Sequence, residues 1–360
     1  MRVFQSFCYY PSYRPRLRRL ATNAATFRQQ IEVFFADRYG ASHILLPVIR
    51  ADPDAFFTNW DDDDLQRAWA REAGMAKSAS LEDILLAQIE SHRTDIFYNI
   101  DPVRLENGFL ARLPGCVKKT IAWRAAPSGN VDFSKYDLVV CNFPAILADL
   151  SQRGYRTAYF APAHDPAMDP FADNSERPID VIFVGGYSRH HLRRAEILNS
   201  VAGLADQFKI VFHLDPSRLS RLAESPIGFL PPLARHRRPQ DVRSVSKLPA
   251  FGLDLYYALS RAKIVLNGAI DMAGNDRGNM RCFEGMGCGA LLLSDDGRYP
   301  DGMVPGNTLL TYDSATDAVA QIRRLLADHD QRRAIAREGH KMVSTRYSKE
   351  IQWLRFQELL

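Results

Sequence analysis

Residues 266–296, LNGAIDMAGNDRGNMRCFEGMGCGALLLSDD, decide how the rest of the chain is interpreted. Their pattern predicts the end of a buried strand over 262–266, a glycine-rich loop, a helix over 280–287 and a second strand over 290–294. Hydrogen-bonding side chains gather in the loop and the start of the helix. They are Asn275, Asp276, Arg277, Asn279, Arg281 and Glu284. Because ligands of open α/β sheets bind at the carboxyl ends of the strands, this loop is a candidate ligand site.

Two interpretations of the polar residues stay open from spacing alone. Arg281 and Glu284 are three residues apart, so they share one face of the predicted helix. They either belong to a binding site or form an ordinary solvated ion pair. Gly287 and Gly289 are typical of a helix end that lets the next strand approach closely.

The pattern N-x-R-x-F-E-x-M-x-C-G-A-L-L-L-S over 279–294 resembles the signature of the group 1 glycosyltransferases. The resemblance is closest to a bacterial branch related to spore-maturation and surface-polysaccharide enzymes. It extends from about residue 180 to the end of the chain and is thinner over 95–163. It implies a GT-B architecture: two Rossmann-like parallel-sheet domains facing a cleft, with a C-terminal helix crossing back to the first domain.

The resemblance also implies roles for two acidic residues. Glu284 matches the glutamate that holds the ribose of a nucleotide-sugar donor. The wider retaining group has a second acidic residue eight positions earlier, where this chain has Asp276 instead of glutamate. Since aspartate has a shorter reach, the stereochemical outcome of transfer stays open.

Alternating strand and helix patterns agree with an α/β chain of two domains. We expect an acceptor domain over 1–163, a nucleotide-sugar donor domain over 164–345 and a terminal helix over 346–360 that packs back on the first domain. In the first domain we expect a strand over 42–48 and a long helix that ends near residue 39.

A second candidate site follows the predicted strand over 179–184. A double glycine and a basic helix start come next, and backbone N–H groups at such a turn bind anions. The residues predicted to bind the donor phosphates are Gly185, Gly186, Ser188, Arg189 and Arg194. The segment lacks G-x-G-x-x-G, so a nicotinamide dinucleotide is not indicated. A tight turn followed by a basic helix is the alternative.

The pattern does not decide which residue would deprotonate an acceptor. Candidate catalytic residues are Asp276, Asp101 at the end of a predicted strand, and His164 at the expected domain junction. An inverting enzyme needs such a base, whereas a retaining enzyme does not. A single loop histidine is more often structural than catalytic. Asn275, Asn279 and Arg281 are predicted to line the sugar and phosphate pocket with Glu284.

Composition excludes several classes of protein. The chain has 360 residues, a net charge of +4 and five scattered cysteines. This charge is too small to indicate a nucleic-acid-binding protein, and no cysteine spacing suits zinc. No apolar run has the length of a membrane span, and no signal-peptide pattern is visible, so we expect a cytoplasmic protein. The acidic run over 61–64 is predicted to cap a helix instead of binding a metal. We expect no cofactor and no metal.

Arg14, Arg16, Arg18 and Arg19 precede the first long helix, where the helix dipole disfavours cations. They indicate either an ordinary solvated helix start or a surface that contacts an anionic acceptor or anionic lipid at the inner face of the membrane.

These observations favour a metal-independent glycosyltransferase that moves a hexose or deoxyhexose from a nucleotide diphosphate to a glycan, lipid-linked or small-molecule acceptor. Two alternatives stay open: a non-catalytic nucleotide- or glycan-binding module, and a nucleotide-sugar epimerase or phosphorylase on the same fold.

Overall fold

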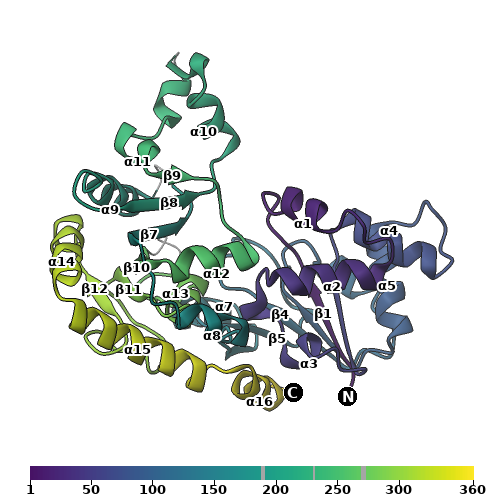
Figure 1. Cartoon of the computed structure of the whole chain (residues 1–360). Coiled ribbons are helices and arrows are strands. Elements are labelled where there is room, and N and C mark those ends of the chain that lie inside the picture. Colours follow the sequence, from purple (N-terminus) through teal and green to yellow (C-terminus); the bar gives the residue numbers. More distant parts are fainter. Residues whose placement is uncertain (188–190, 230–231, 269–272) are drawn as a thin grey trace. The chain divides into compact units, whose positions relative to one another are not determined.

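The computed structural model describes residues 1–187, 191–229, 232–268 and 273–360. The chain forms two compact units (Figure 1). Unit 1 comprises Met1–Ala163 together with Lys349–Leu360, and unit 2 comprises His164–Ser348. Each unit contains a six-stranded parallel sheet, which confirms the predicted α/β class.

The first strand of unit 1 lies next to one edge of its sheet, with one later strand on one side and four on the other. Across the sheet the strands are β2 (Ala55–Asn59), β1 (Val3–Phe7), β3 (Ile96–Asn99), β4 (Lys119–Trp123), β5 (Leu138–Cys141) and β6 (Thr157–Tyr159). The helices of unit 1 are α1 (Arg14–Leu20), α2 (Phe27–Asp37), α3 (Leu46–Ile49), α4 (Asp63–Glu72), α5 (Leu81–Ser91), α6 (Asn107–Leu110), α7 (Pro144–Gln152) and α16 (Lys349–Glu358).

The prediction of a strand over 42–48 is wrong. The segment forms a 3₁₀ turn, Ala41–His43, followed by the short helix α3. Pro47 lies at the start of α3, where a missing N–H group costs no helix hydrogen bond. The Gln5 side chain donates to the His43 carbonyl over 2.8 Å and accepts from the Leu45 N–H over 3.0 Å. These bonds satisfy backbone groups that a strand would pair with a neighbour. Of the two strands beside β1, β3 was predicted and β2 was missed by the sequence analysis.

The long helix expected to end near residue 39 is divided. α1 ends at Leu20, and α2 begins only after Thr26. Thr26 and Gln29 form a capping box, in which each side chain accepts from the other residue's N–H group. A capping box fixes a helix start, so it separates α2 from the turns before it.

The sheet of unit 2 runs β12 (Leu310–Tyr312), β11 (Leu291–Asp295), β10 (Ala262–Leu266), β7 (Ile179–Gly185), β8 (Ile210–Leu214) and β9 (Ser246–Lys247). The helices are α8 (Asp169–Ala172), α9 (Leu192–Ala202), α10 (Arg218–Ala223), α11 (Gln240–Ser244), α12 (Gly252–Ser260), α13 (Met280–Gly287), α14 (Ala315–Ala327) and α15 (His329–Arg346). One continuous apolar core joins alternate residues of β7, β8, β10 and β11 to α9, α11 and α14.

The terminal helix α16 belongs to unit 1. Lys349, at its start, is buried and donates from Nζ to the carbonyls of Ala41 and, over 2.6 Å, Ile44. Phe356 packs its ring against Tyr98 and Phe160. A buried lysine that donates to carbonyls fixes the helix in one register, because sliding would leave its charge unsolvated.

Among the helices that the structure describes, none has both the length and the apolar composition needed to cross a membrane.

Candidate functional site

Residues 266–296 form the elements predicted for them. β10 ends at Leu266, α13 covers Met280–Gly287, and β11 covers Leu291–Asp295. Gly289 has a φ of +70°, and a Cβ there would lie 2.7 Å from the Ala172 carbonyl oxygen. A glycine is therefore required where the chain turns from α13 into β11.

Arg281 and Glu284 form a largely buried ion pair on α13. Nη1 of Arg281 lies 2.6 Å from Oε2 of Glu284, and the two side chains are 17% and 6% exposed. Burial raises the pKa of the Glu284 carboxyl, and the charge of Arg281 opposes that shift. Since so little of either side chain is exposed, the interpretation as an ordinary solvated surface pair is wrong. The arrangement keeps a carboxylate in a desolvated position, where hydrogen bonds to a ligand are strong.

The carboxyl group of Asp276 forms an ion pair with an arginine from the segment after β11. Its Oδ1 accepts from Nε and Nη2 of Arg298 over 2.6 and 2.5 Å, and its side chain is 1% exposed. Arg277 makes a parallel connection, since its Nε lies 2.8 Å from Oδ2 of Asp295. Asn275 is exposed and accepts from the Arg298 N–H through its backbone carbonyl. The two ion pairs hold the described part of the loop against the end of β11.

Asn279 belongs to a buried polar network that the sequence analysis missed. Its Nδ2 donates to Oδ1 of Asn267 over 3.1 Å, and Asn267 donates to Oγ of Ser294 over 2.9 Å. Asn267 follows β10 directly and Ser294 lies near the end of β11. Polar residues at the carboxyl ends of two predicted neighbouring strands are the signal that would have indicated them.

The double glycine lies at the carboxyl end of β7. Gly185 is its last residue, and a Cβ at Gly186 would meet no atom within 4 Å. Nη2 of Arg194, on α9, donates to the Gly268 carbonyl after β10, and Nη1 donates to the Gly186 carbonyl over 3.5 Å. Arg194 thus connects the turn after β7 to the chain after β10. Ser188 and Arg189 lie outside the described residues.

The other two candidate bases are held by neighbouring side chains. His164 is 2% exposed, and its Nε2 lies 2.8 Å from Oδ1 of Asp169. Burial lowers the pKa of its imidazole, against the opposing effect of Asp169. Asp101 accepts from Nε1 of Trp60 over 3.0 Å and pairs with Arg104 over 2.6 Å. These contacts favour structural roles for both residues in this conformation, and their catalytic assignment stays a prediction.

Three of the four N-terminal arginines have carboxylate partners inside unit 1. Arg14 pairs with Asp61 over 3.1 Å, Arg16 with Asp37 over 2.6 Å and Arg18 with Asp64 over 3.1 Å. These partners offset the cations at the start of α1, so the segment is explained without an external anion. The acidic run acts as predicted in part, because Oδ1 of Asp62 accepts from the Leu65 N–H and caps α4.

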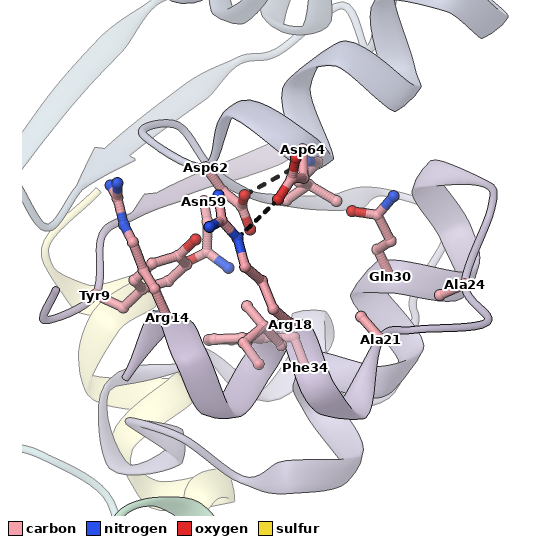
Figure 2. A pocket seen from close by; sticks show the side chains of 12 residues that line it. Tyr9, Arg14, Arg18, Ala21, Ala24, Gln30, Phe34, Asn59, Asp62 and Asp64 are labelled. Atoms are coloured by element: carbon pink, nitrogen blue, oxygen red, sulfur yellow. Dashed lines mark hydrogen bonds and ion pairs between the residues drawn. The ribbon is translucent and has the colours of Figure 1, made fainter. Parts of the chain in front are cut away.

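A cavity of about 220 Å³ lies in unit 1. Figure 2 shows side chains of α1, α2 and the start of α4 around it, with the exposed pair Arg18–Asp64 joining α1 to α4. Tyr9 and Asn59, which follow β1 and end β2, also line it. Both amide atoms of Asn59 are buried and have no hydrogen-bond partner.

Asp62 adds a buried carboxyl group to this cavity. It is 9% exposed and hydrogen-bonded to the Tyr9 hydroxyl, and burial raises its pKa. An amide without partners beside a carboxyl and a phenol suits a ligand that is rich in hydroxyl groups.

Among the described residues, no group of three or more His, Cys, Asp or Glu side chains is placed to hold a metal ion.

Comparison with known proteins adds to this geometry. Residues 232–356 match a family model described as glycosyl transferase-like, and this region contains Arg281 and Glu284. The whole chain also matches a solved structure of HepE from Anabaena in complex with UDP, with a TM-score of 0.60 and 11% identity, over 100% of this chain and 99% of that one. The chain has the GT-B fold of these proteins. The implied spore-maturation branch stays a prediction.

Two other solved structures share the fold of this chain. Sucrose-phosphate synthase from Thermosynechococcus elongatus matches 100% of this chain over 98% of its own, with a TM-score of 0.53 and 14% identity. A glycosyltransferase from Rickettsia africae matches 99% of this chain over 97% of its own, with a TM-score of 0.58 and 10% identity. No curated protein matches the sequence.

Proposed function

We propose that this protein is a glycosyltransferase that takes its sugar from a nucleoside diphosphate donor bound at the carboxyl edge of the unit 2 sheet. The buried Glu284 carboxylate is the observation that carries the proposal. An ionised carboxylate only accepts hydrogen bonds, and its two oxygens match the two neighbouring hydroxyls of a ribose. Arg281 donates to this carboxyl group and orients it, and its charge opposes the rise in pKa that burial causes.

The diphosphate is assigned to the turn after β7. Gly185 and Gly186 bring backbone close to a ligand, and Arg194 lies beside them. Positive groups near the leaving diphosphate would stabilise the negative charge that develops during transfer. A uridine diphosphate sugar is the first donor to test, because structures of the similar Anabaena protein contain UDP or UDP-glucose.

We assign the acceptor to the cavity in unit 1. Asn59 offers a donor and an acceptor that lack partners, and Tyr9 offers an aromatic ring. Neighbouring hydroxyls of a sugar satisfy both amide atoms at once. The acceptor is therefore proposed to be a glycan, or a lipid-linked or small molecule that presents a sugar.

The proposed site uses arginine and backbone groups to hold the phosphates, so we expect transfer without a divalent metal or another cofactor. Activity should then be unchanged in excess chelator. The five cysteines are free thiols. Free thiols favour a reducing compartment, and we propose the cytoplasm as the place of action.

Calorimetric titration with uridine, guanosine and thymidine diphosphates tests the donor proposal. We expect micromolar binding of one of them by the wild type and at least about tenfold weaker binding by Glu284→Gln. If none of the three nucleotides releases or absorbs heat, the donor assignment is wrong. Binding without transfer or slow donor hydrolysis would favour a non-catalytic module.

A further inference from the structure

A basic cavity of about 460 Å³ lies at the amino edge of the unit 2 sheet. Its lining includes Arg177, which precedes β7, Lys263 in β10, and a group of basic side chains at the start of α15. The α15 residues are His329, Arg332, Arg333 and Arg337. Asp173 is a carboxylate in the same lining. Neither the glycosyl-transfer site nor the acceptor cavity uses any of these residues.

The two most enclosed arginines of this cavity are bound by neutral groups. Arg177 donates to the carbonyls of Ala262, Ala172 and Cys288 over 3.0 to 3.1 Å. Arg332 is 5% exposed and donates to the Leu325 carbonyl over 2.8 Å. Burial lowers the pKa of both guanidinium groups, and a neighbouring arginine lowers each further, whereas Asp180 and Asp328 oppose the shift of Arg332. A bound anion would relieve this repulsion.

The α15 cations also lack the partners that α1 has. At α1, Arg14, Arg16 and Arg18 each have a carboxylate within 3.1 Å. Within the described parts of the chain, no carboxylate lies within 4.0 Å of the charged nitrogens of Arg333 or Arg337 or of the two enclosed arginines. Lys263 is the exception in this cavity, since its Nζ lies 2.6 Å from Asp180.

Two local effects make this arrangement unfavourable in the absence of a ligand. Arg333 and Arg337 are four residues apart on α15, so like charges face each other on one side of the helix. The cations at the first turn also oppose the helix dipole, although Asp328 caps the helix and Asp330 lies in its first turn. The chain therefore holds a concentration of positive charge that its own carboxylates do not neutralise.

We propose that this cavity binds a phosphate monoester, at a site separate from the donor site. Arginine forks match phosphate oxygens in paired hydrogen bonds, and the cavity has the size of a small phosphorylated sugar or polyol. β10 connects the amino ends of the strands to their carboxyl ends, so the two sites are separated by roughly 17 Å along the strand direction. The proposal does not depend on the nucleotide assignment, because it uses the opposite edge of the sheet.

The test uses the full chain in phosphate-free buffer and three variants. Calorimetry measures the binding of inorganic phosphate and glucose 6-phosphate to the wild type and to the double variant Arg333→Gln/Arg337→Gln. The same titrations are made with Arg194→Gln, at the donor edge, and with Arg323→Gln as a control. Arg323 is an exposed arginine of α14 that does not line the cavity. We expect the double variant to lose affinity by at least about tenfold while its melting temperature is unchanged. The affinity of the other two variants should equal that of the wild type.

A comparison of vesicles distinguishes a lipid source of the phosphate from a soluble one. Vesicles with and without phosphatidic acid are sedimented with the wild type and with the double variant. Binding to phosphatidic acid alone, lost in the double variant, would identify a lipid headgroup as the phosphate monoester. If neither soluble phosphates nor these vesicles bind, or if binding is lost in Arg194→Gln and kept in the double variant, the proposal is overturned.

Discussion

Arg281 donates from Nη1 to Oε2 of Glu284 over 2.6 Å, one turn apart on α13, and the carboxyl group is almost fully buried. The pair couples ligand binding to stability, because the same carboxylate neutralises a largely buried guanidinium. A variant that removes only one partner therefore leaves an uncompensated charge in a desolvated place.

The first prediction separates these two roles of Glu284. Glu284→Gln should lower the free energy of unfolding by about 3 kcal/mol, because Arg281 then lacks its counter-charge. Arg281→Met/Glu284→Leu should recover most of that stability without recovering nucleotide binding. Urea unfolding and calorimetry on the same preparations check both statements. A single variant as stable as the wild type would show that the pair is solvated and not buried.

The second prediction concerns the dependence of stability on pH. Burial raises the pKa of the Glu284 carboxyl above its value in the unfolded chain. Just above the ordinary glutamate pKa of about 4.3, the folded protein therefore binds this proton more tightly than the unfolded chain does. In that window the contribution of Glu284 to stability should decrease as the pH rises, and below the window it should be constant. The measurement is the difference in unfolding free energy between the wild type and Glu284→Gln, followed from about pH 4 to about pH 7.

The affinity for nucleotide should change with pH in the opposite direction. Only the ionised carboxylate accepts two ribose hydroxyls, so affinity should fall as the pH decreases through the raised pKa of Glu284. Calorimetry at several pH values detects this decrease, and Glu284→Gln should show a flat profile. Equal profiles for the two proteins would assign the pH dependence to another group.

The third prediction concerns Asn59 in unit 1. Asn59→Leu keeps the side-chain volume and removes two buried polar atoms that have no partner. We expect the free energy of unfolding to rise by about 1 kcal/mol, while the KM for the acceptor rises and the KM for the donor is unchanged. Thermal unfolding and steady-state kinetics check this combination. A less stable variant would mean that the amide has a partner, such as an ordered water molecule.

The fourth prediction compares two arginines of α1. The carboxyl group of Asp37 is 4% exposed and binds both Arg16 and the Tyr13 hydroxyl. Arg16→Ala should therefore cost about 3 kcal/mol of stability. Arg18 and Asp64 are 70% and 60% exposed, so Arg18→Ala should cost less than about 1 kcal/mol. Urea unfolding of the two variants distinguishes them, and equal losses would contradict this account.

Local patterns were sufficient for the elements around Glu284. β10, α13 and β11 were predicted within one or two residues, because a short apolar strand, a helical face and a turn glycine are each set by neighbouring residues. The segment before Ile49 was predicted wrongly because a distant residue, and not its neighbours, sets its conformation. Its apolar run suits a strand, but Gln5, about 40 residues away, satisfies its backbone groups in another conformation.

The amino-acid sequence by itself determined the parallel α/β class, the glycosyltransferase signature and the carboxyl-edge location of Glu284, since these follow from periodicity and from the residues next to it. Only the tertiary structure decided that Arg14, Arg16 and Arg18 are neutralised within unit 1, whereas Arg333 and Arg337 are not. Both groups have the same appearance in sequence. Their difference depends on carboxylates many residues away, and packing alone decides which distant side chains meet.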